Sequence, residues 1–421
     1  MSDSAASAPA LPAAGAPAGA GHVALFIGIA GTVVTLVGMS FFTGQQAAFG
    51  WLTALVFWTG VALGMLFLIM LTYLFDAGWS VVVRRQLEHG VAAFKWLALL
   101  FAPLLLISVF SRHHDLLWKW MNPGFDLATV GGHGRVGEDV LYEKKSAFLS
   151  LPFFVLRTAV YFGSWILLAY IFRRNSFAQD ADGDVKWTLS SRKWAAAGLA
   201  LTALTATFAA IDWVKTLEYH WFSTMYGVWY FSSSMRGALA TLAIVCTIGV
   251  LAGPLRGLVN RAHFYDIGKL MLTFTIFWAY ICFSQYFLIW NANIPEETFW
   301  YNLRESGDWW YVGLTLVFGH FLVPFLYLLS YANKINPRRL VIIAVWNLAM
   351  VLVDVCYNVL PAEKDAAGMP LPFFSGQLGW NLVALLGVGG ICAWAYCRSF
   401  ASSKLIPIHD PRIEESLQHR E

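Results

Sequence analysis

The sequence predicts an all-α polytopic membrane protein with about ten transmembrane helices. Of its 421 residues, 58% are hydrophobic and only 13% are charged, whereas soluble domains carry roughly 25% charged residues. The apolar residues fall into stretches long enough to cross a bilayer core, which takes about 20 residues per helix. Lys and Arg gather in alternate loops, which is typical of a chain that crosses a membrane many times.

Ten apolar stretches are candidate transmembrane helices. The sixth is longer than one crossing needs, and it begins with HWFSTMYGVWY, a segment rich in the Trp and Tyr that favour the membrane interface. We therefore expect the sixth helix to be preceded by an interfacial segment. The ten stretches are residues 22–42, 51–74, 91–110, 147–172, 194–211, 221–250, 267–290, 309–331, 339–360 and 376–398.

The distribution of Lys and Arg predicts the orientation. The richer loops surround residues 84–85, 173–193, 256–269 and 334–339. The positive-inside rule places these loops, and the tail at 399–421, in the cytoplasm. An even number of crossings then puts both termini there. Residues 1–21 are rich in Ala, Pro, Gly and Ser and contain no Lys or Arg, which predicts a disordered cytoplasmic tail and not a signal peptide.

Several function classes lack their motifs. The five cysteines form no C-x-x-C or C-x-x-C-H, so the sequence does not support an iron–sulfur cluster, a c-type haem or a structural zinc site. No phosphate-binding G-x-x-x-x-G-K-[ST] is present, which argues against an ATPase. A membrane b-type haem needs paired histidines, and only His320 lies deep in a span. We expect no metal centre and no nucleic-acid partner.

Ionisable residues inside membrane spans are costly and usually face protein or water. Arg157 lies in the fourth span, Arg236 in the sixth, His320 in the eighth and Asp354 in the ninth, while Gln285 adds a polar group from the seventh. These side chains are the first candidates for a functional site.

The spacing within the ninth span adds a second observation. Asn347, Asp354 and Asn358 are separated by seven and four residues, so a helix places them on one face. We expect this polar face to meet another helix or water.

Two interpretations of the buried charges stay open, beside a ligand or lipid site. In the first, Arg157 or Arg236 pairs with Asp354 and the pair only stabilises the fold. In the second, protonatable groups and water relay protons, for which His is suited near neutral pH. That polar track would enter at Asp212, Glu218 and His220, pass His320, Gln285 and Asp354, and leave near Asp76, Lys95 or Asp266. The segment 211–230, IDWVKTLEYHWFSTMYGVWY, would lie wet at the outer membrane surface, anchored by Trp213, Trp221 and Tyr226.

Four segments in a fixed order carry a family resemblance. They are DWVKTLEYHWFSTMYGVWYF, YFLIWNANIPEETFWYNLR, GDWWYVGLTLVFGHFLVPF and NKINPRRL. Together they resemble a family of NrfD-like membrane subunits of bacterial alternative complex III, a quinol:cytochrome c oxidoreductase of the respiratory chain. The resemblance covers residues 200–360 most strongly.

The resemblance implies a fold similar to that of the membrane subunit of polysulfide reductase. Two four-helix bundles would be flanked by one helix at each end. On this sequence, residues 22–50 would form the first helix, 51–211 the first bundle, 212–360 the second bundle and 361–398 the last helix.

The resemblance also implies partners and location. The partners would be a sister membrane subunit, an iron–sulfur protein and c-type cytochromes, in the bacterial inner (cytoplasmic) membrane. This chain would carry no metal centre and no covalently bound cofactor, with quinol or menaquinol and membrane lipid as candidate ligands.

Three functions remain open. The leading hypothesis is a non-redox subunit of the quinol-oxidising complex with a proton-conducting polar track. The second is a quinol-binding subunit, with His320 and Asp354, or Asp212 and His220, as donor and base. The third is a secondary transporter, although Pro103 and Pro324 do not form the paired broken helices of that class. Whether the chain itself takes part in enzyme chemistry is left open.

Overall fold

The computed structural model describes residues 18–41, 44–110 and 115–420, and it confirms the predicted fold class. Within these ranges the chain forms helices, with two isolated β-bridges and no β-strand. Ten of the helices are long and apolar enough to cross a membrane. Most of the expected disordered tail at 1–21 lies outside the described residues, but its last residues already belong to the first helix.

Eight of the ten spans are single α-helices. They are α1 (Ala18–Phe41), α2 (Gly44–Leu74), α6 (Leu151–Asp182), α7 (Lys186–Trp213), α8 (Tyr226–Ala252), α9 (Arg261–Ala292), α14 (Pro337–Val359) and α15 (Gly376–Ala401).

The other two spans are composite. The third runs through η1 (Gly78–Ser80), α3 (Val81–Gly90), η2 (Val91–Ala93) and α4 (Phe94–Phe110). The eighth runs through α11 (Asp308–Thr315), the π-helix η7 (Leu316–Leu322) and α12 (Val323–Leu329).

Short helices occupy the connections. They are η3 (Lys119–Met121), η4 (Leu127–Val130), η5 (Val136–Glu138), α5 (Val140–Lys145), η6 (Lys215–Glu218), α10 (Pro295–Arg304), α13 (Tyr331–Ile335), η8 (Leu360–Ala362) and α16 (Ile413–Leu417).

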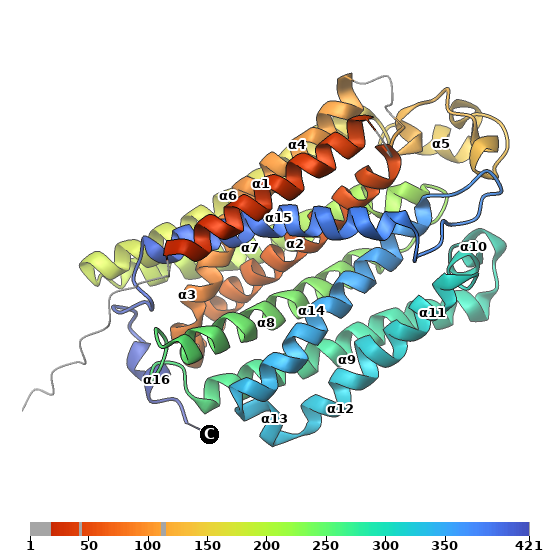
Figure 1. Ribbon diagram of the computed structural model, residues 1–421. Helices are drawn as coiled ribbons and strands as arrows, with labels where there is room; N and C mark the ends of the chain where they lie inside the picture. Colours follow the sequence, from red (N-terminus) through yellow and green to blue (C-terminus); the bar gives the residue numbers. More distant parts are fainter. Residues whose placement is uncertain (1–17, 42–43, 111–114, 421) are drawn as a thin grey trace, which may run out of the picture.

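The spans pack as two rings of four helices each, and the rings meet at α2 and α8 (Figure 1). Helices α2, α4, α6 and α7 contact one another, and so do α8, α9, α12 and α14. Helix α2 packs along α8 and so joins the rings, while α1 and α15 pack on each other and against α2. Each ring corresponds to one of the expected four-helix bundles. Helix α2 is apolar on all sides and almost entirely buried, as expected for a central helix.

Small residues allow the central helices to approach closely. A Cβ added at Gly64 of α2 would lie 2.1 Å from the backbone oxygen of Ser234 in α8, and one at Gly31 of α1 would lie 2.7 Å from Gly387 of α15. Contacts of this kind replace the hydrophobic effect as a source of helix association in lipid. Gly64 therefore sets the distance between the two bundles.

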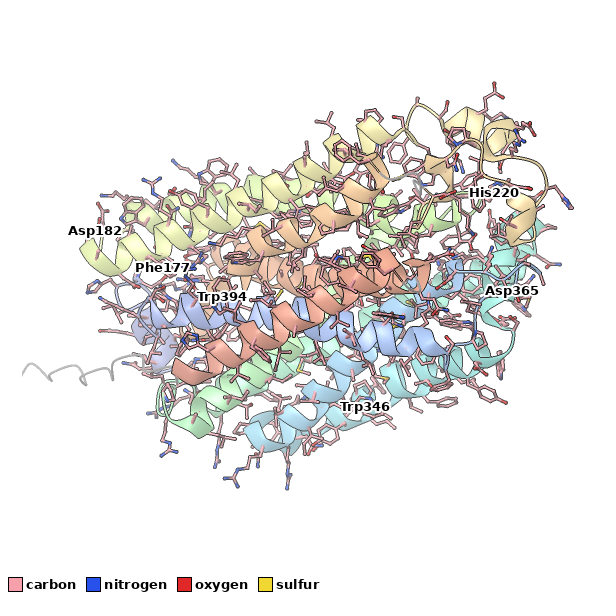
Figure 2. The ribbon with its side chains drawn as sticks, turned by 45° about the horizontal axis from the view of Figure 1, so that its top comes forward. Phe177, Asp182, His220, Trp346, Asp365 and Trp394 are labelled. Atoms are coloured by element: carbon pink, nitrogen blue, oxygen red, sulfur yellow. The ribbon has the colours of Figure 1, made fainter. Side chains whose placement is uncertain are left out.

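The connections divide between two opposite ends of the molecule. His220 and Asp365 lie at one end and Asp182 lies at the other (Figure 2). We call these the His220 end and the Asp182 end. The Lys- and Arg-rich loops belong to the Asp182 end, so the predicted orientation places that end in the cytoplasm.

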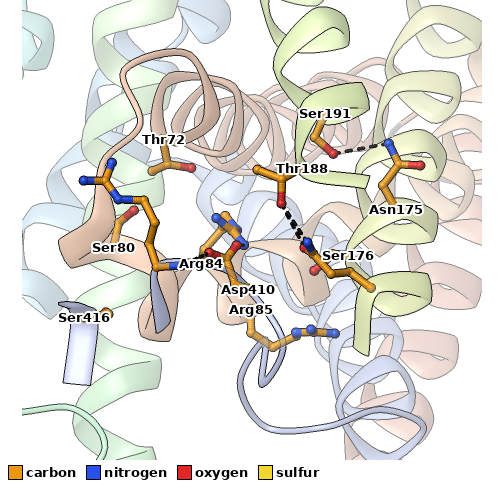
Figure 3. Close-up of polar contacts among 12 residues, drawn as sticks. Thr72, Ser80, Arg84, Arg85, Asn175, Ser176, Thr188, Ser191, Asp410 and Ser416 are labelled. Atoms are coloured by element: carbon orange, nitrogen blue, oxygen red, sulfur yellow. Dashed lines mark hydrogen bonds and ion pairs between the residues drawn. The ribbon is translucent and has the colours of Figure 1, made fainter. Parts of the chain in front are cut away.

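The third span begins at Gly78 and not at residue 91 as predicted. The segment α3 reads VVVRRQLEHG, and its four charged or titratable side chains suggest a loop in the sequence. In the structure Arg84 and Arg85 are buried and paired. Arg84 Nη2 lies 2.5 Å from Asp410 Oδ2 (Figure 3). Arg85 Nη2 lies 2.6 Å from Asp180 Oδ2. Paired charges thus allow a polar sequence to continue the span.

The C-terminal residues 402–420 fold back over the Asp182 end, although the sequence predicts a tail there. The Ser416 hydroxyl donates to the Trp79 carbonyl at 2.7 Å and accepts from the Val82 amide. His419 Nε2 lies 2.6 Å from Asp266 Oδ2 at the start of α9. The segment therefore ties the third span to the seventh, one from each bundle.

Candidate functional site

The polar face predicted for α14 is turned toward α8. Each of its three residues accepts a hydrogen bond from a side chain of that helix. The pairs are Arg236 Nη2 to Asn347 Oδ1 at 3.0 Å, Trp229 Nε1 to Asp354 Oδ2 at 3.0 Å, and Tyr226 Oη to Asn358 Oδ1 at 3.1 Å. The two helices are thus joined by a row of polar contacts inside the second bundle.

Asp354 is held by neutral donors alone. Its Oδ2 accepts from Trp229 Nε1, from Ser233 Oγ at 3.0 Å and from Trp278 Nε1 at 3.1 Å. The carboxyl group is 1% exposed. Within the described structure no ion pair joins it to Arg236, whose Nη2 donates to the His320 carbonyl and to Asn347, so the interpretation that pairs Arg236 with Asp354 does not hold. A buried carboxylate with three neutral donors can be either a fixed charge or a proton carrier.

His320 lies in the π-helical turn of the eighth span. Pro324, four residues later, has no amide hydrogen to donate to the His320 carbonyl. That carbonyl accepts from Arg236 Nη2 at 2.6 Å instead, and the preceding Gly319 carbonyl accepts from Trp346 Nε1 at 2.7 Å. Single π-turns of this kind are frequent at functional sites.

Several buried polar atoms around His320 have no hydrogen-bond partner among the described residues. They are both ring nitrogens of His320 and Nε and Nη1 of Arg236, whose Nη2 donates to the His320 carbonyl. The His320 ring stands edge-on to Trp278, with ring centroids 4.2 Å apart, so Trp278 lies between the imidazole and Asp354. Buried polar groups without protein partners are the sites that ordered water completes in folded proteins.

A pocket of about 720 Å³ adjoins this cluster. It lies between α9, the α11–η7 segment, α10 and α14. Its wall is mainly apolar and aromatic, and Asp354, Asn358 and Gln285 contribute polar atoms. The pocket therefore brings together Gln285 and Asp354, two of the predicted site residues.

Gln285 belongs to the part of the pocket nearest the His220 end. Its Oε1 accepts from Ser223 Oγ at 2.6 Å, and its Nε2 donates to the Tyr301 hydroxyl at 2.9 Å. Tyr301 lies on α10, and burial raises the pKa of its phenol, so the hydroxyl keeps its proton.

Arg304 closes the same end of the pocket, and each of its three nitrogens donates a hydrogen bond to a backbone carbonyl. Its Nε, Nη1 and Nη2 donate to the carbonyls of Tyr357, Trp300 and Asn358. The guanidinium lies 3.4 Å from the ring centroid of Trp300. Burial lowers the pKa of Arg304 to about 10, which leaves it charged at neutral pH. Arg304 thus caps the carbonyl end of α14, where a cation is favourable.

Asp212 does not belong to the second-bundle cluster, which contradicts the predicted track. It is fully buried in the first bundle, not wet, with Oδ2 at 2.7 Å from Arg157 Nε and Oδ1 at 2.9 Å from Arg157 Nη2. The Tyr161 hydroxyl also donates to it at 2.6 Å. The structural charge pairing predicted for Arg157 exists, but its partner is Asp212 and not Asp354.

Glu218 and His220 also have local partners at the His220 end. Glu218 Oε1 lies 2.9 Å from Lys364 Nζ, and His220 contacts the carboxylate of Asp139. Burial opposes ionisation of Asp139, but hydrogen bonds from Tyr219 and His220 hold its pKa below the ordinary value. Of the six predicted track residues, the structure therefore gathers only Gln285, His320 and Asp354.

The aromatic residues predicted as membrane anchors, and the residues predicted at the inner end of the polar track, also contact other side chains of the protein. Trp213, Trp221 and Tyr226 are buried among other aromatic rings and do not face lipid. Asp76 pairs with Arg192 and Arg412, and Asp266 with Lys269 and His419. Lys95 lies over the ring of Trp96.

The aromatic members of the site are not evident from the sequence. Trp278, Tyr301 and Tyr357 are three among 20 Trp and 16 Tyr residues, and abundance of this kind usually reflects packing. One signal was present: Trp278 and Gln285 are seven residues apart on α9, which places them on one face.

No group of three or more His, Cys, Asp or Glu side chains that could hold a metal ion occurs in the described ranges. Comparison of the chain with protein-family models and with curated proteins finds no match. The site must therefore be interpreted from its own geometry.

Proposed function

We propose that the chain is a non-redox membrane subunit of a bacterial quinol:cytochrome c oxidoreductase complex, and that its second bundle relays protons. The order of the four sequence segments supports the choice of complex. In this proposal the chain lies in the inner membrane with both termini in the cytoplasm. Its partners are a sister membrane subunit, an iron–sulfur protein and c-type cytochromes.

The cluster around Trp278 carries the proton-relay part of the proposal. Asp354 and His320 are both buried and both able to hold a proton, and the unpartnered atoms of Arg236 lie beside them. Ionisable groups inside a membrane are rare and usually serve transport or a proton relay. A purely structural cluster would satisfy its buried donors and acceptors with protein atoms.

Each group has a distinct role in the relay. The Asp354 carboxylate takes up a proton at the end of the cluster nearer the His220 end, where the pocket reaches it. The His320 imidazole holds a proton deeper in the span, and ordered water at the unpartnered atoms completes the path. Arg236 is fixed by two hydrogen bonds and supplies a positive charge that does not move.

Membership in a complex is tested by affinity purification of the tagged chain from membranes in mild detergent. Co-purification of c-type haem and iron–sulfur protein supports the proposal. Recovery of this chain alone, without either partner, contradicts it and favours a transporter.

The relay is tested in the purified complex by the variants Asp354→Asn and His320→Ala. Both should assemble, and both should lower the number of protons released per quinol oxidised. If the ratio is unchanged in both variants, the cluster only stabilises the bundle.

A further inference from the structure

We propose that Trp346 of α14 is a positioning residue for the proton relay, because its indole N–H stabilises the π-helical turn that carries His320. It acts on the backbone of the eighth span and not on a proton-carrying group. The proposal rests on the proposed function only for the effect on proton release. The effect on the position of the imidazole follows from the geometry of the turn.

The His320 side chain is not fixed by hydrogen bonds of its own. Neither ring nitrogen has a partner among the described residues. The imidazole is fully buried and packs edge-on against Trp278, with ring centroids 4.2 Å apart. Its place in the cluster is therefore set by that packing contact and by the backbone of η7.

The backbone of η7 leaves the Gly319 carbonyl without an amide donor. In an α-helix this carbonyl would accept from Val323, and in a π-helix from Pro324. The Val323 amide donates instead to the Phe318 carbonyl, one residue earlier, and Pro324 has no amide hydrogen. Because an unpartnered carbonyl is costly at membrane depth, the π-turn needs a donor from another helix.

Trp346 supplies that donor. Its Nε1 lies 2.7 Å from the Gly319 carbonyl oxygen. Glycine at this position lets the indole approach, since a Cβ there would lie 3.3 Å from Cζ2 of Trp346 and 3.1 Å from Sδ of Met350. The Trp346 side chain, which Figure 2 labels, is 40% exposed. Its donor can therefore be removed with less loss of packing than at a core position.

The next residue of α14 acts on the next carbonyl of η7. Asn347 Oδ1 accepts from Arg236 Nη2 at 3.0 Å, and the same nitrogen donates to the His320 carbonyl at 2.6 Å. Two neighbouring residues of α14 thus stabilise two neighbouring carbonyls of η7, one directly and one through Arg236. The π-turn is stabilised from outside its own helix at both points.

Loss of the Trp346 donor changes the helical register of the turn. The Val323 amide is then the nearest donor for the Gly319 carbonyl, and a bond between them replaces the π-turn by an α-turn. An α-turn closes with one residue fewer than a π-turn, so the segments before and after it rotate relative to each other. We expect the His320 imidazole to leave its place against Trp278.

The test is solid-state NMR of the full chain in membranes, with ¹⁵N-labelled histidine as the probe. Subtraction of the His320→Ala spectrum identifies the His320 signals among those of the ten histidines. Trp346→Phe keeps an aromatic ring but removes the donor, so the His320 signals should shift. Unchanged His320 signals in folded Trp346→Phe would overturn the proposal.

Trp58→Phe is the matched control. Trp58 is also partly buried, and its Nε1 also donates to a carbonyl of another span, that of Leu385 at 3.1 Å. Since this contact joins α2 to α15 and not to η7, the control should leave the His320 signals in place. An equal shift in the control would show a general effect of losing an interhelical indole bond, which contradicts a specific role for Trp346.

Pro324→Ala distinguishes the carbonyl bond from packing of the indole. The new amide can donate to the Gly319 or the His320 carbonyl, so the turn depends less on Trp346. Trp346→Phe should then shift the His320 signals less in this background than in the unmodified chain. An equal shift in both backgrounds would overturn the proposal. If Trp346→Phe alone does not fold, the double variant should fold, and its failure to do so would also overturn the proposal.

Proton release per quinol oxidised distinguishes this proposal from the relay. Shifted His320 signals and a lower ratio in Trp346→Phe support both. Shifted signals with an unchanged ratio, in Trp346→Phe and in Asp354→Asn, support the positioning role and contradict the relay. Unshifted signals in Trp346→Phe with a lower ratio in Asp354→Asn support the relay and overturn the positioning role.

Discussion

The ion pair between Arg157 and Asp212 gives the strongest stability prediction. Asp212 is fully buried, and its carboxylate accepts two hydrogen bonds from Arg157, at 2.7 and 2.9 Å, and one from Tyr161 at 2.6 Å. Asp212→Asn keeps the shape of the side chain but leaves the Arg157 charge without its counter-ion. Removal of one partner from a buried pair costs about 3–5 kcal/mol. Since asparagine still offers one acceptor, we expect the lower value, roughly 3 kcal/mol.

The assay is the free energy of unfolding in mixed detergent micelles, followed by tryptophan fluorescence during titration with a denaturing detergent. The matched control is Asp182→Asn, because the side chain of Asp182 is 44% exposed where it pairs with Lys186. Exposed pairs contribute about 0–1 kcal/mol. The control should therefore change stability little.

The double variant Arg157→Leu with Asp212→Leu distinguishes the loss of the ion pair from the cost of leaving one buried charge unpaired. It leaves no buried charge at this pair, so it should be less destabilised than Asp212→Asn. A cost below about 1 kcal/mol for Asp212→Asn would refute the reasoning, because an abandoned buried charge costs more than that. The reasoning would also be refuted if the double variant lost more unfolding free energy than Arg157→Leu and Asp212→Leu lose together as single variants.

Three further predictions concern packing, pH and the C-terminal segment. Gly64→Ala should reduce folded yield, because its Cβ would meet the Ser234 backbone at 2.1 Å, while Gly163→Ala should not, as size-exclusion profiles will show. Burial raises the pKa of Glu363 to about 7, so its contribution to stability is present below its unfolded pKa and is lost as pH rises through 7. Glu363→Gln should flatten the pH dependence of unfolding in that window, and an unaltered dependence would contradict the assignment. Asp410→Ala should lower stability by about 1–3 kcal/mol in the same unfolding assay, because it removes the 2.5 Å contact to buried Arg84.

Local periodicity predicts part of the site. The spacing of Asn347, Asp354 and Asn358 places them on one face of a helix, and the structure turns that face toward α8. His320 and Gln285 are recognisable because polar groups inside apolar spans are few. These inferences need only the geometry of one helix at a time.

Pairing between distant helices is not predictable from the same information. Asp212 forms an ion pair with Arg157 because α7 packs on α6, and the sequence of neither helix alone specifies which helix will be its neighbour. The start of the third span was missed for a related reason. Arg84 and Arg85 look like loop residues until their acidic partners, which come from the ends of α6 and of the chain, are known.

The number of protons released per quinol oxidised, in the complex reconstituted into vesicles, tests the central claim most directly. The comparison is between Asp354→Asn and Asp212→Asn, two buried carboxyls in different bundles. The relay predicts that the ratio falls in Asp354→Asn and is unchanged in Asp212→Asn when equal amounts of folded complex are compared. Equal ratios in both variants and in the unmodified complex would contradict the account.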